Sequence, residues 1–212
     1  MELCRPERRN ALDPQAVAEL HRAVTGDGAG PILLTAEGPA FCAGGDLRVL
    51  QEAAESGGLA EVLTTNAVAF ADLIEAVVAC PRPVVAVLDG PAVGGGASLA
   101  LACDLRVATA RARLVFNWSR YGLPPDGHAT TLLGWAVGPD RARALLAGAA
   151  EITTGSELAS QLFTGIIEKR PNWRELLAAM TASRDEELAA IARAAADEVT
   201  GERLAVLYKI DI

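Results

Sequence analysis

The sequence is poor in aromatic residues and has no long apolar run. Phe, Trp and Tyr together make up 4% of the 212 residues, so Ala, Leu and Val must form most of a hydrophobic core. No segment reaches the roughly 18 consecutive apolar residues that a membrane-spanning helix requires. The charged segment 1–10 also lacks the apolar centre of a secretory signal. These absences predict a soluble, cytoplasmic protein without a membrane partner.

Positive charge and metal-binding patterns are scarce as well. The chain has 19 Lys and Arg against 27 Asp and Glu, which gives a formal net charge of -8. Such a surface repels phosphate backbones, so we expect no nucleic-acid partner. The four cysteines form no CxxC or metal-ligand pattern. We therefore expect buried free thiols in a reducing compartment and no metal site.

What the sequence does contain is an alternation of strand and helix patterns. Short apolar runs indicate buried strands, and apolar residues at every third or fourth position indicate helices. Strands are expected at 30–35, 84–88, 105–108 and 114–116, and helices from Pro14, over 59–80 and 97–103, and again after Asp126 and Pro139. The alternation predicts an α/β fold. From Pro171 onward the chain is helical by propensity, as a docking helix or a subunit contact would be.

Two glycine-rich turns lie between these elements. Gly94-Gly95-Gly96 opens a helix, where backbone N–H groups are unpaired and the helix dipole is positive. The turn 42–46 also offers free N–H groups. Two such donors converging on one oxygen would form an oxyanion hole; the alternative is a pair of tightly packed turns. Neither the P-loop nor the GxGxxG signature is present, so the glycines do not indicate a nucleotide site.

Six stretches of the chain resemble the crotonase (enoyl-CoA hydratase/isomerase) superfamily in order and separation. They are RPERRNAL (5–12), AFCAGGDL (40–47), PRPVVA (81–86), GPAVGGG (90–96), ACDLRVA (102–108) and GLPPD (122–126). The resemblance implies a crotonase-like α/β fold of repeated ββα turns over 1–170. A helical C-terminal region, 171–212, would serve packing or oligomerisation. Members of this superfamily usually assemble as trimers or dimers of trimers, so we expect a homotrimer or hexamer.

The resemblance also implies a ligand and an oxyanion hole. The ligand is an acyl-CoA or acyl-pantetheine thioester, whose carbonyl oxygen accepts the N–H groups of the residues that match Ala43 and Gly95. Coenzyme A is then part of the substrate, and no separate cofactor is expected. The acyl pocket would be shaped by loops at 48–66 and by the C-terminal region.

The side chains near that hole decide which reaction follows. Hydratases of this family carry glutamates at the positions of Ser98 and Trp118, and neither residue can by itself activate water and deliver a proton. Asp126 matches the catalytic aspartate of the double-bond isomerases. It also matches the nucleophile of the 4-chlorobenzoyl-CoA dehalogenase branch, in which a tryptophan matches Trp118. An indole N–H could hold the carboxylate in place. We expect Asp126, assisted by Trp118, to act as the base of an isomerase or as a nucleophile.

Each of these residues also has a structural interpretation. Pro-Pro-Asp-Gly-His is a good helix N-cap, so Asp126 could simply accept a backbone N–H. Trp118 could be a core aromatic, and Ser98 could be a packing residue. His128 could orient Asp126, contact substrate or be exposed; Ser98 and His128 are included as substrate-binding candidates. A crotonase-fold protein that binds a thioester or another subunit without turnover is the alternative to an enzyme.

Overall fold

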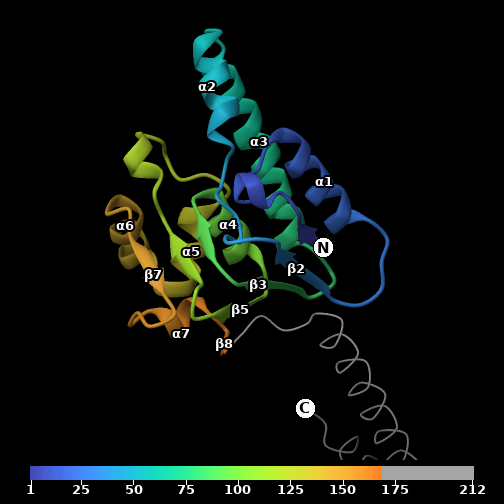
Figure 1. Ribbon diagram of the computed structural model, residues 1–212. Helices are drawn as coiled ribbons and strands as arrows, with labels where there is room; N and C mark the ends of the chain where they lie inside the picture. The colour runs from blue at the N-terminus through green and yellow to red at the C-terminus, as the bar shows by residue number, and fades with distance from the viewer. Residues whose placement is uncertain (169–212) are drawn as a thin grey trace, which may run out of the picture. The chain divides into compact units, whose positions relative to one another are not determined.

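The larger sheet consists of five parallel strands in the order β1-β2-β3-β5-β8. Their bounds are β1 Glu2–Leu3, β2 Ile32–Ala36, β3 Val84–Leu88, β5 Leu105–Thr109 and β8 Gly165–Ile167. The computed structural model describes residues 1–168 (Figure 1). The helical region expected over 171–212 lies outside the described residues. Strands β2 and β3 are buried along their whole length, as parallel strands covered on both faces are.

A smaller sheet has the order β4-β6-β7. Strands β4 (Pro91–Val93) and β6 (Arg113–Val115) are parallel, whereas β7 (Glu151–Thr153) is antiparallel to β6. The chain runs from β3 to β4 and into helix α4 (Gly95–Ala102). It then repeats this path from β5 to β6 and on to α5 (Ala129–Val137). Two successive ββα turns are therefore present, and the predicted crotonase-like α/β fold is confirmed.

Helix α4 lies in the centre of the described part of the molecule. Each of its residues is buried, and it packs against α3 and α5. Glycine, alanine and serine make up most of its sequence, which lets neighbouring backbones approach closely. The N-terminus of α4 follows β4 directly. The predicted Gly94-Gly95-Gly96 turn therefore opens a helix that is buried.

Helices α1 (Pro14–Thr25) and α3 (Leu59–Val78) pack against each other beside the larger sheet (Figure 1). The predicted start of α1 is confirmed, because Asp13 accepts the Ala16 N–H at 2.8 Å and a proline follows. On α3 the buried residues are Phe70, Leu73, Ile74 and Val77, spaced as an amphipathic helix requires.

The stretch 48–66, expected to contribute loops to the pocket, is largely helical, and its first part forms a helix that the sequence did not predict. Helix α2 (Leu47–Glu55) begins directly after Asp46, whose carboxylate accepts the Arg48 N–H at 3.1 Å. A short turn around Gly57, with φ +79°, leads into α3. The N-cap explains the difference, since Asp46 satisfies a backbone donor that a loop would leave to solvent.

The remaining described helices are short: η1 (Pro6–Arg8), η2 (Trp118–Tyr121), α6 (Pro139–Ala147) and α7 (Ala159–Leu162). Helix α6 packs against α5, and η2 carries one of the predicted site residues. Within residues 1–168, no helix combines the length and apolar character that crossing a membrane needs.

Candidate active site

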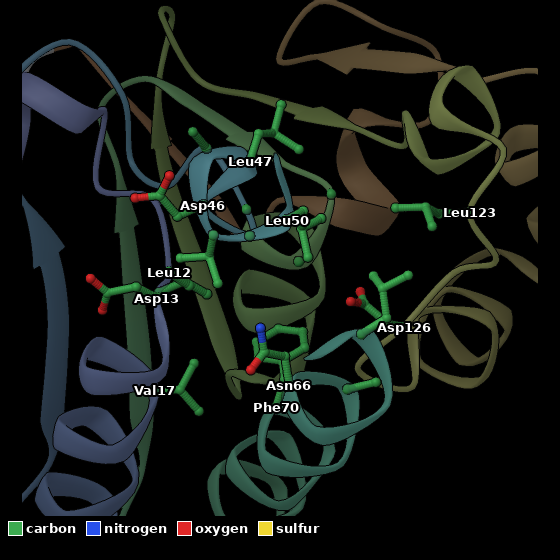
Figure 2. Close-up of a pocket in the computed structure, with 18 of the residues that line it drawn as sticks. Leu12, Asp13, Val17, Asp46, Leu47, Leu50, Asn66, Phe70, Leu123 and Asp126 are labelled. Atoms are coloured by element: carbon green, nitrogen blue, oxygen red, sulfur yellow. The ribbon is translucent and has the colours of Figure 1, made fainter. Parts of the chain in front are cut away.

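A pocket lies between the first turn of α1, helices α2 and α3, and the segments that follow β4 and β6. Its volume is about 980 Å³, including the part open to solvent. Figure 2 shows leucine, valine and phenylalanine side chains on several sides of this space, with Asp126 among them. A mostly apolar wall with a few polar groups is typical of small-molecule sites.

The first glycine-rich turn presents a different N–H group from the one expected. The Ala43 N–H donates to the carbonyl of Arg9 at 3.0 Å, and the Leu12 N–H donates to the carbonyl of Gly44 at 2.7 Å. No acceptor among residues 1–168 takes the Gly45 N–H, and Gly45 lines the pocket. Because its own N–H is already paired, Ala43 is not the donor, and Gly45 replaces it as the candidate.

The second glycine-rich turn agrees with the prediction for Gly95. Gly94 has φ +52°, a left-handed conformation that favours glycine, and its N–H donates to the Val115 carbonyl at 2.9 Å. Gly95 is the first residue of α4, and within the described residues its N–H has no acceptor. A Cβ atom on Gly44 would lie 3.2 Å from the Gly95 nitrogen, so the two turns touch. The free N–H groups of Gly45 and Gly95 therefore belong to adjoining segments of one pocket.

Asp126 lies beside this pair of turns and is held by Trp118. The Trp118 indole N–H donates to Oδ1 of Asp126 at 2.9 Å, the contact that the resemblance to the dehalogenase branch suggested. Trp118 is 6% exposed and stacks on Phe116 with ring centroids 6.4 Å apart. Oδ1 of Asp126 is 3.9 Å from the position that a Cβ on Gly95 would take. The carboxylate thus adjoins the Gly95 end of the pocket.

The helix-cap interpretation of Asp126 is wrong. Helix α5 begins at Ala129, and the residue at its cap position is His128, with φ +56° and no side-chain cap. The His128 side chain contacts α3 at the surface: its Nε2 lies 3.0 Å from Oε1 of Glu75. It does not line the pocket. The structure therefore places His128 next to Asp126 in sequence but outside the pocket.

Ser98 contacts the backbone of Asp126 from outside the pocket. Its hydroxyl is fully buried and donates to the Asp126 carbonyl at 3.1 Å. Ser98 does not line the pocket, so its position suits a support for the turn that carries Asp126.

Burial raises the pKa of Asp126, and the hydrogen bond from Trp118 partly offsets this effect. A carboxyl group with a raised pKa can exchange protons more readily near neutral pH.

Phe70 is a residue of the site that the sequence did not single out. It lines the pocket, is 5% exposed, and its ring would lie 3.2 Å from a Cβ on Gly95. The same ring would collide with a Cβ on Gly127, whose φ is +53°. Phe70 therefore packs against both Gly95 at the start of α4 and the turn that carries Asp126. Its sequence signal is its place in the apolar stripe of α3, which also fits an ordinary core residue.

Two further carboxylates of the pocket wall are neutralised by arginines. Asp13 pairs with Arg5 at 2.7 Å, and Asp46 pairs with Arg8 at 3.1 Å. Both aspartates also cap helices, α1 and α2 respectively. Among the carboxylates that line the pocket, Asp126 is therefore the one without an arginine partner.

Potential metal ligands gather in one place within the described residues. Glu2, Cys4 and Glu37 bring their ligand atoms within 4.8 Å of one another at the surface. None of the three lines the pocket that contains Asp126. Exposed acidic residues often lie together without an ion, so this cluster does not indicate a metal centre.

Comparison with known proteins places this geometry in a family. The family model for enoyl-CoA hydratase/isomerase matches residues 1–202. The chain belongs to the enoyl-CoA hydratase/isomerase family. A crystal structure of an enoyl-CoA hydratase from Polaromonas is similar with a TM-score of 0.72 and 32% identity, covering 85% of this chain and 71% of that one. An enoyl-CoA hydratase of Bacillus anthracis is similar with the same TM-score, 0.72, at 27% identity, covering 89% of this chain and 71% of that one.

Relatives within the enoyl-CoA hydratase/isomerase family carry different names. A Mycobacterium bovis protein named "Probable enoyl-CoA hydratase" is 42% identical over 172 residues, which are 80% of this chain and 65% of that protein. A 4-chlorobenzoyl coenzyme A dehalogenase of Arthrobacter is 35% identical over 145 residues, which are 65% of this chain and 51% of that protein. This chain thus matches less than two thirds of the length of either relative.

Proposed function

We propose that this protein binds an acyl-CoA or acyl-pantetheine thioester and shifts a double bond in its acyl group. The thioester oxygen accepts hydrogen bonds from the N–H groups of Gly45 and Gly95, and Asp126 is the base. The observation that supports this assignment is the juxtaposition of two unpaired backbone N–H groups and one arginine-free carboxylate in a single pocket.

The reaction follows from where charge develops. Asp126 takes a proton from the carbon next to the thioester carbonyl, and the C–H electron pair moves toward the oxygen to give an enolate. The N–H groups stabilise this negative charge; removing one such donor typically costs about 100-fold or more in rate. The carboxylic acid then returns its proton at the γ-carbon as the double bond shifts, which regenerates the carboxylate. Coenzyme A takes part only as the carrier of the acyl group.

Three of the four relatives described above are named hydratases, but the side chains of this protein favour isomerisation. The hydroxyl of Ser98 is buried and donates to a carbonyl, and the indole N–H of Trp118 donates to Asp126. Neither group is a carboxylate that could activate water. A single free carboxylate is enough to move a proton between two carbons of one substrate, and Asp126 supplies it.

The experiment that tests this function follows substrate protons in deuterated water. Wild type and Asp126→Asn are incubated with 3-enoyl-CoAs and arylacetyl-CoAs, and exchange at the α- and γ-carbons is measured by NMR. We expect exchange in the wild type and its loss in Asp126→Asn, with binding of the thioester kept. Exchange that persists in Asp126→Asn would show that another group is the base. Tight binding without exchange in either protein would indicate a non-catalytic binder.

A nucleophilic role of Asp126 is the second candidate. It is supported by the similarity to the Arthrobacter dehalogenase and by the hydrogen bond that fixes Oδ1, while no side chain of residues 1–168 donates to Oδ2. In that reaction Oδ2 attacks an activated carbon of an aryl thioester, the leaving group departs with its electron pair, and water later releases the ester. Mass spectrometry of protein quenched during turnover would reveal the ester on Asp126, which an isomerase does not form.

The proposal extends to assembly and location. Family membership supports a homotrimer or hexamer, and the four free cysteines support a reducing compartment such as the cytoplasm. The mass of the protein in solution tests the first point. A monomer at micromolar concentration would contradict it.

A further inference from the structure

The face of α3 that borders the pocket has one polar interruption. Leu63, Asn66, Ala67 and Phe70 line the pocket and follow the i, i+3, i+4, i+7 pattern of an apolar helix stripe. Asn66 occupies a position at which this pattern calls for an apolar side chain. In Figure 2 its carboxamide is directed into the pocket, near the side chain of Phe70. Asn66 as a whole is partly buried.

Several other polar side chains of the wall already have partners within the protein. Asp13 and Asp46 cap helices and pair with arginines, and the Trp118 N–H is given to Asp126. Asn66, by contrast, makes no side-chain hydrogen bond to any of the described residues 1–168. A half-buried carboxamide with two donors and an acceptor therefore faces the ligand space unpaired.

The position of Asn66 relates it to the acyl group. Four residues separate it from Phe70, which corresponds to about 6 Å along a helix, and Phe70 packs against Gly95. Asn66 therefore lies about one helical turn along α3 from a residue that borders the proposed oxyanion hole, in the direction that an acyl chain could extend along the pocket wall. Leu63 and Leu50, which line the same pocket, are apolar. They suit an acyl chain better than the amide-rich pantetheine arm.

We propose that Asn66 is a specificity-determining residue that hydrogen-bonds an oxygen on the acyl group, a few bonds beyond the thioester. The substrate class is then an acyl thioester with a hydroxyl or carbonyl group in its acyl chain. This inference rests on the proposed thioester binding. A plain alkyl chain would cover the carboxamide without giving it a partner, and an unpaired buried polar group is unfavourable. A matching oxygen removes that cost, and sites of this kind reject analogues that lack the oxygen.

The test measures affinity rather than turnover. Saturated medium-chain acyl-CoAs, which have no double bond to move, are prepared in pairs that end in methyl or in hydroxyl. Dissociation constants are determined by calorimetry for wild type, for Asn66→Leu and for Thr65→Ala. Thr65 is exposed, adjoins Asn66 on α3 and does not line the pocket, so it serves as the matched control. For the chain length that fits best, wild type and the control should bind the hydroxyl member about tenfold more tightly, the effect of one hydrogen bond.

In Asn66→Leu this preference should vanish or reverse, while binding of the methyl member is kept or improved. Equal affinities for both members in the wild type at every chain length would overturn the proposal. So would an equal loss of affinity for both members in Asn66→Leu, because that result would place the carboxamide on the pantetheine arm. If wild type binds no acyl-CoA of the series, the proposed function itself fails, and that result is distinct from a missing preference. Circular dichroism of each variant establishes that the fold is kept.

Discussion

Replacing Trp118 with phenylalanine removes one hydrogen bond and leaves an aromatic ring in place. The indole N–H donates to Oδ1 of Asp126 at 2.9 Å, and the ring stacks on Phe116. A hydrogen bond to a charged group typically contributes about 1.5–3 kcal/mol. Because Asp126 is only partly buried, the lower end of this range applies, which corresponds to about tenfold in an equilibrium.

The direction in which Trp118→Phe shifts the pKa of Asp126 depends on which protonation state of Asp126 the indole stabilises. Burial raises the pKa of Asp126, and the Trp118 hydrogen bond lowers it by favouring the carboxylate. Without that bond the pKa rises further. A base must be ionised, so activity is present above this pKa and is lost as the pH falls through it. Trp118→Phe should therefore move the acidic limb of the profile of kcat/KM against pH to higher pH, with about a tenfold loss of rate on that limb.

The assay is the rate of double-bond migration or of α-proton exchange between pH 4 and pH 8. Trp135→Phe is the matched control: the same replacement, but at a residue of α5 that is 73% exposed. An acidic limb that stays in place in Trp118→Phe, or moves to lower pH, would refute the reasoning. An equal shift in Trp135→Phe would show that the limb does not report on Asp126.

Three further predictions concern the surroundings of the site. Gly127→Ala should lower the Tm strongly, because a Cβ there collides with an aromatic ring of α3 and the residue has φ +53°. The expected loss of folding free energy is about 2–4 kcal/mol. Gly57→Ala, at a residue with φ +79° and open space around it, should lose less stability, and equal losses in the two variants would contradict the packing argument. Ser98→Ala should reduce the free energy of unfolding by about 1 kcal/mol, as measured in urea, because a buried hydrogen bond to the Asp126 carbonyl is lost; an unchanged midpoint would exclude this support. Burial raises the pKa of Cys42 to about 12, so its thiol should resist alkylation by iodoacetamide at pH 8. An exposed thiol of the chain should react under the same conditions. Mass spectrometry of the folded protein after treatment measures both.

Short-range patterns were enough to predict much of the fold. The proline after Asp13 and the periodicity over 59–80 identified helices α1 and α3, and short apolar runs identified β3 and β5. Helix α2 was missed because it spans only nine residues, Leu47–Glu55. Its start depends on the conformation of Asp46, a residue that the sequence showed only as part of a turn.

The site was predictable where one local feature decides it. Gly95 stands at a helix start, where its N–H has no helical acceptor, and the resemblance to the dehalogenase branch singled out Trp118 together with Asp126. The donor of the other turn was not predictable from the turn alone. The N–H of Ala43 is not available to a ligand because it donates to the carbonyl of Arg9, which comes from a distant segment of the sequence.

Residues that face the pocket from α3 were not distinguished from core residues. A helix stripe facing a pocket and one facing a core show the same spacing, so Phe70 gave no separate signal. Asn66 did interrupt the stripe, but its meaning depends on which neighbours leave its carboxamide unpaired. That information exists only in the folded chain.

The central claim is that the N–H of Gly45, with that of Gly95, stabilises the enolate of a bound thioester. Replacing the amide at residue 45 by an ester, through incorporation of glycolic acid, removes this N–H and leaves the side chain unchanged. The account predicts that α-proton exchange falls by about 100-fold while the thioester still binds. The matched ester at Ala43 removes its N–H to the Arg9 carbonyl, and exchange should be largely kept. Full exchange with the ester at Gly45, or a larger loss with the ester at Ala43, would contradict the account.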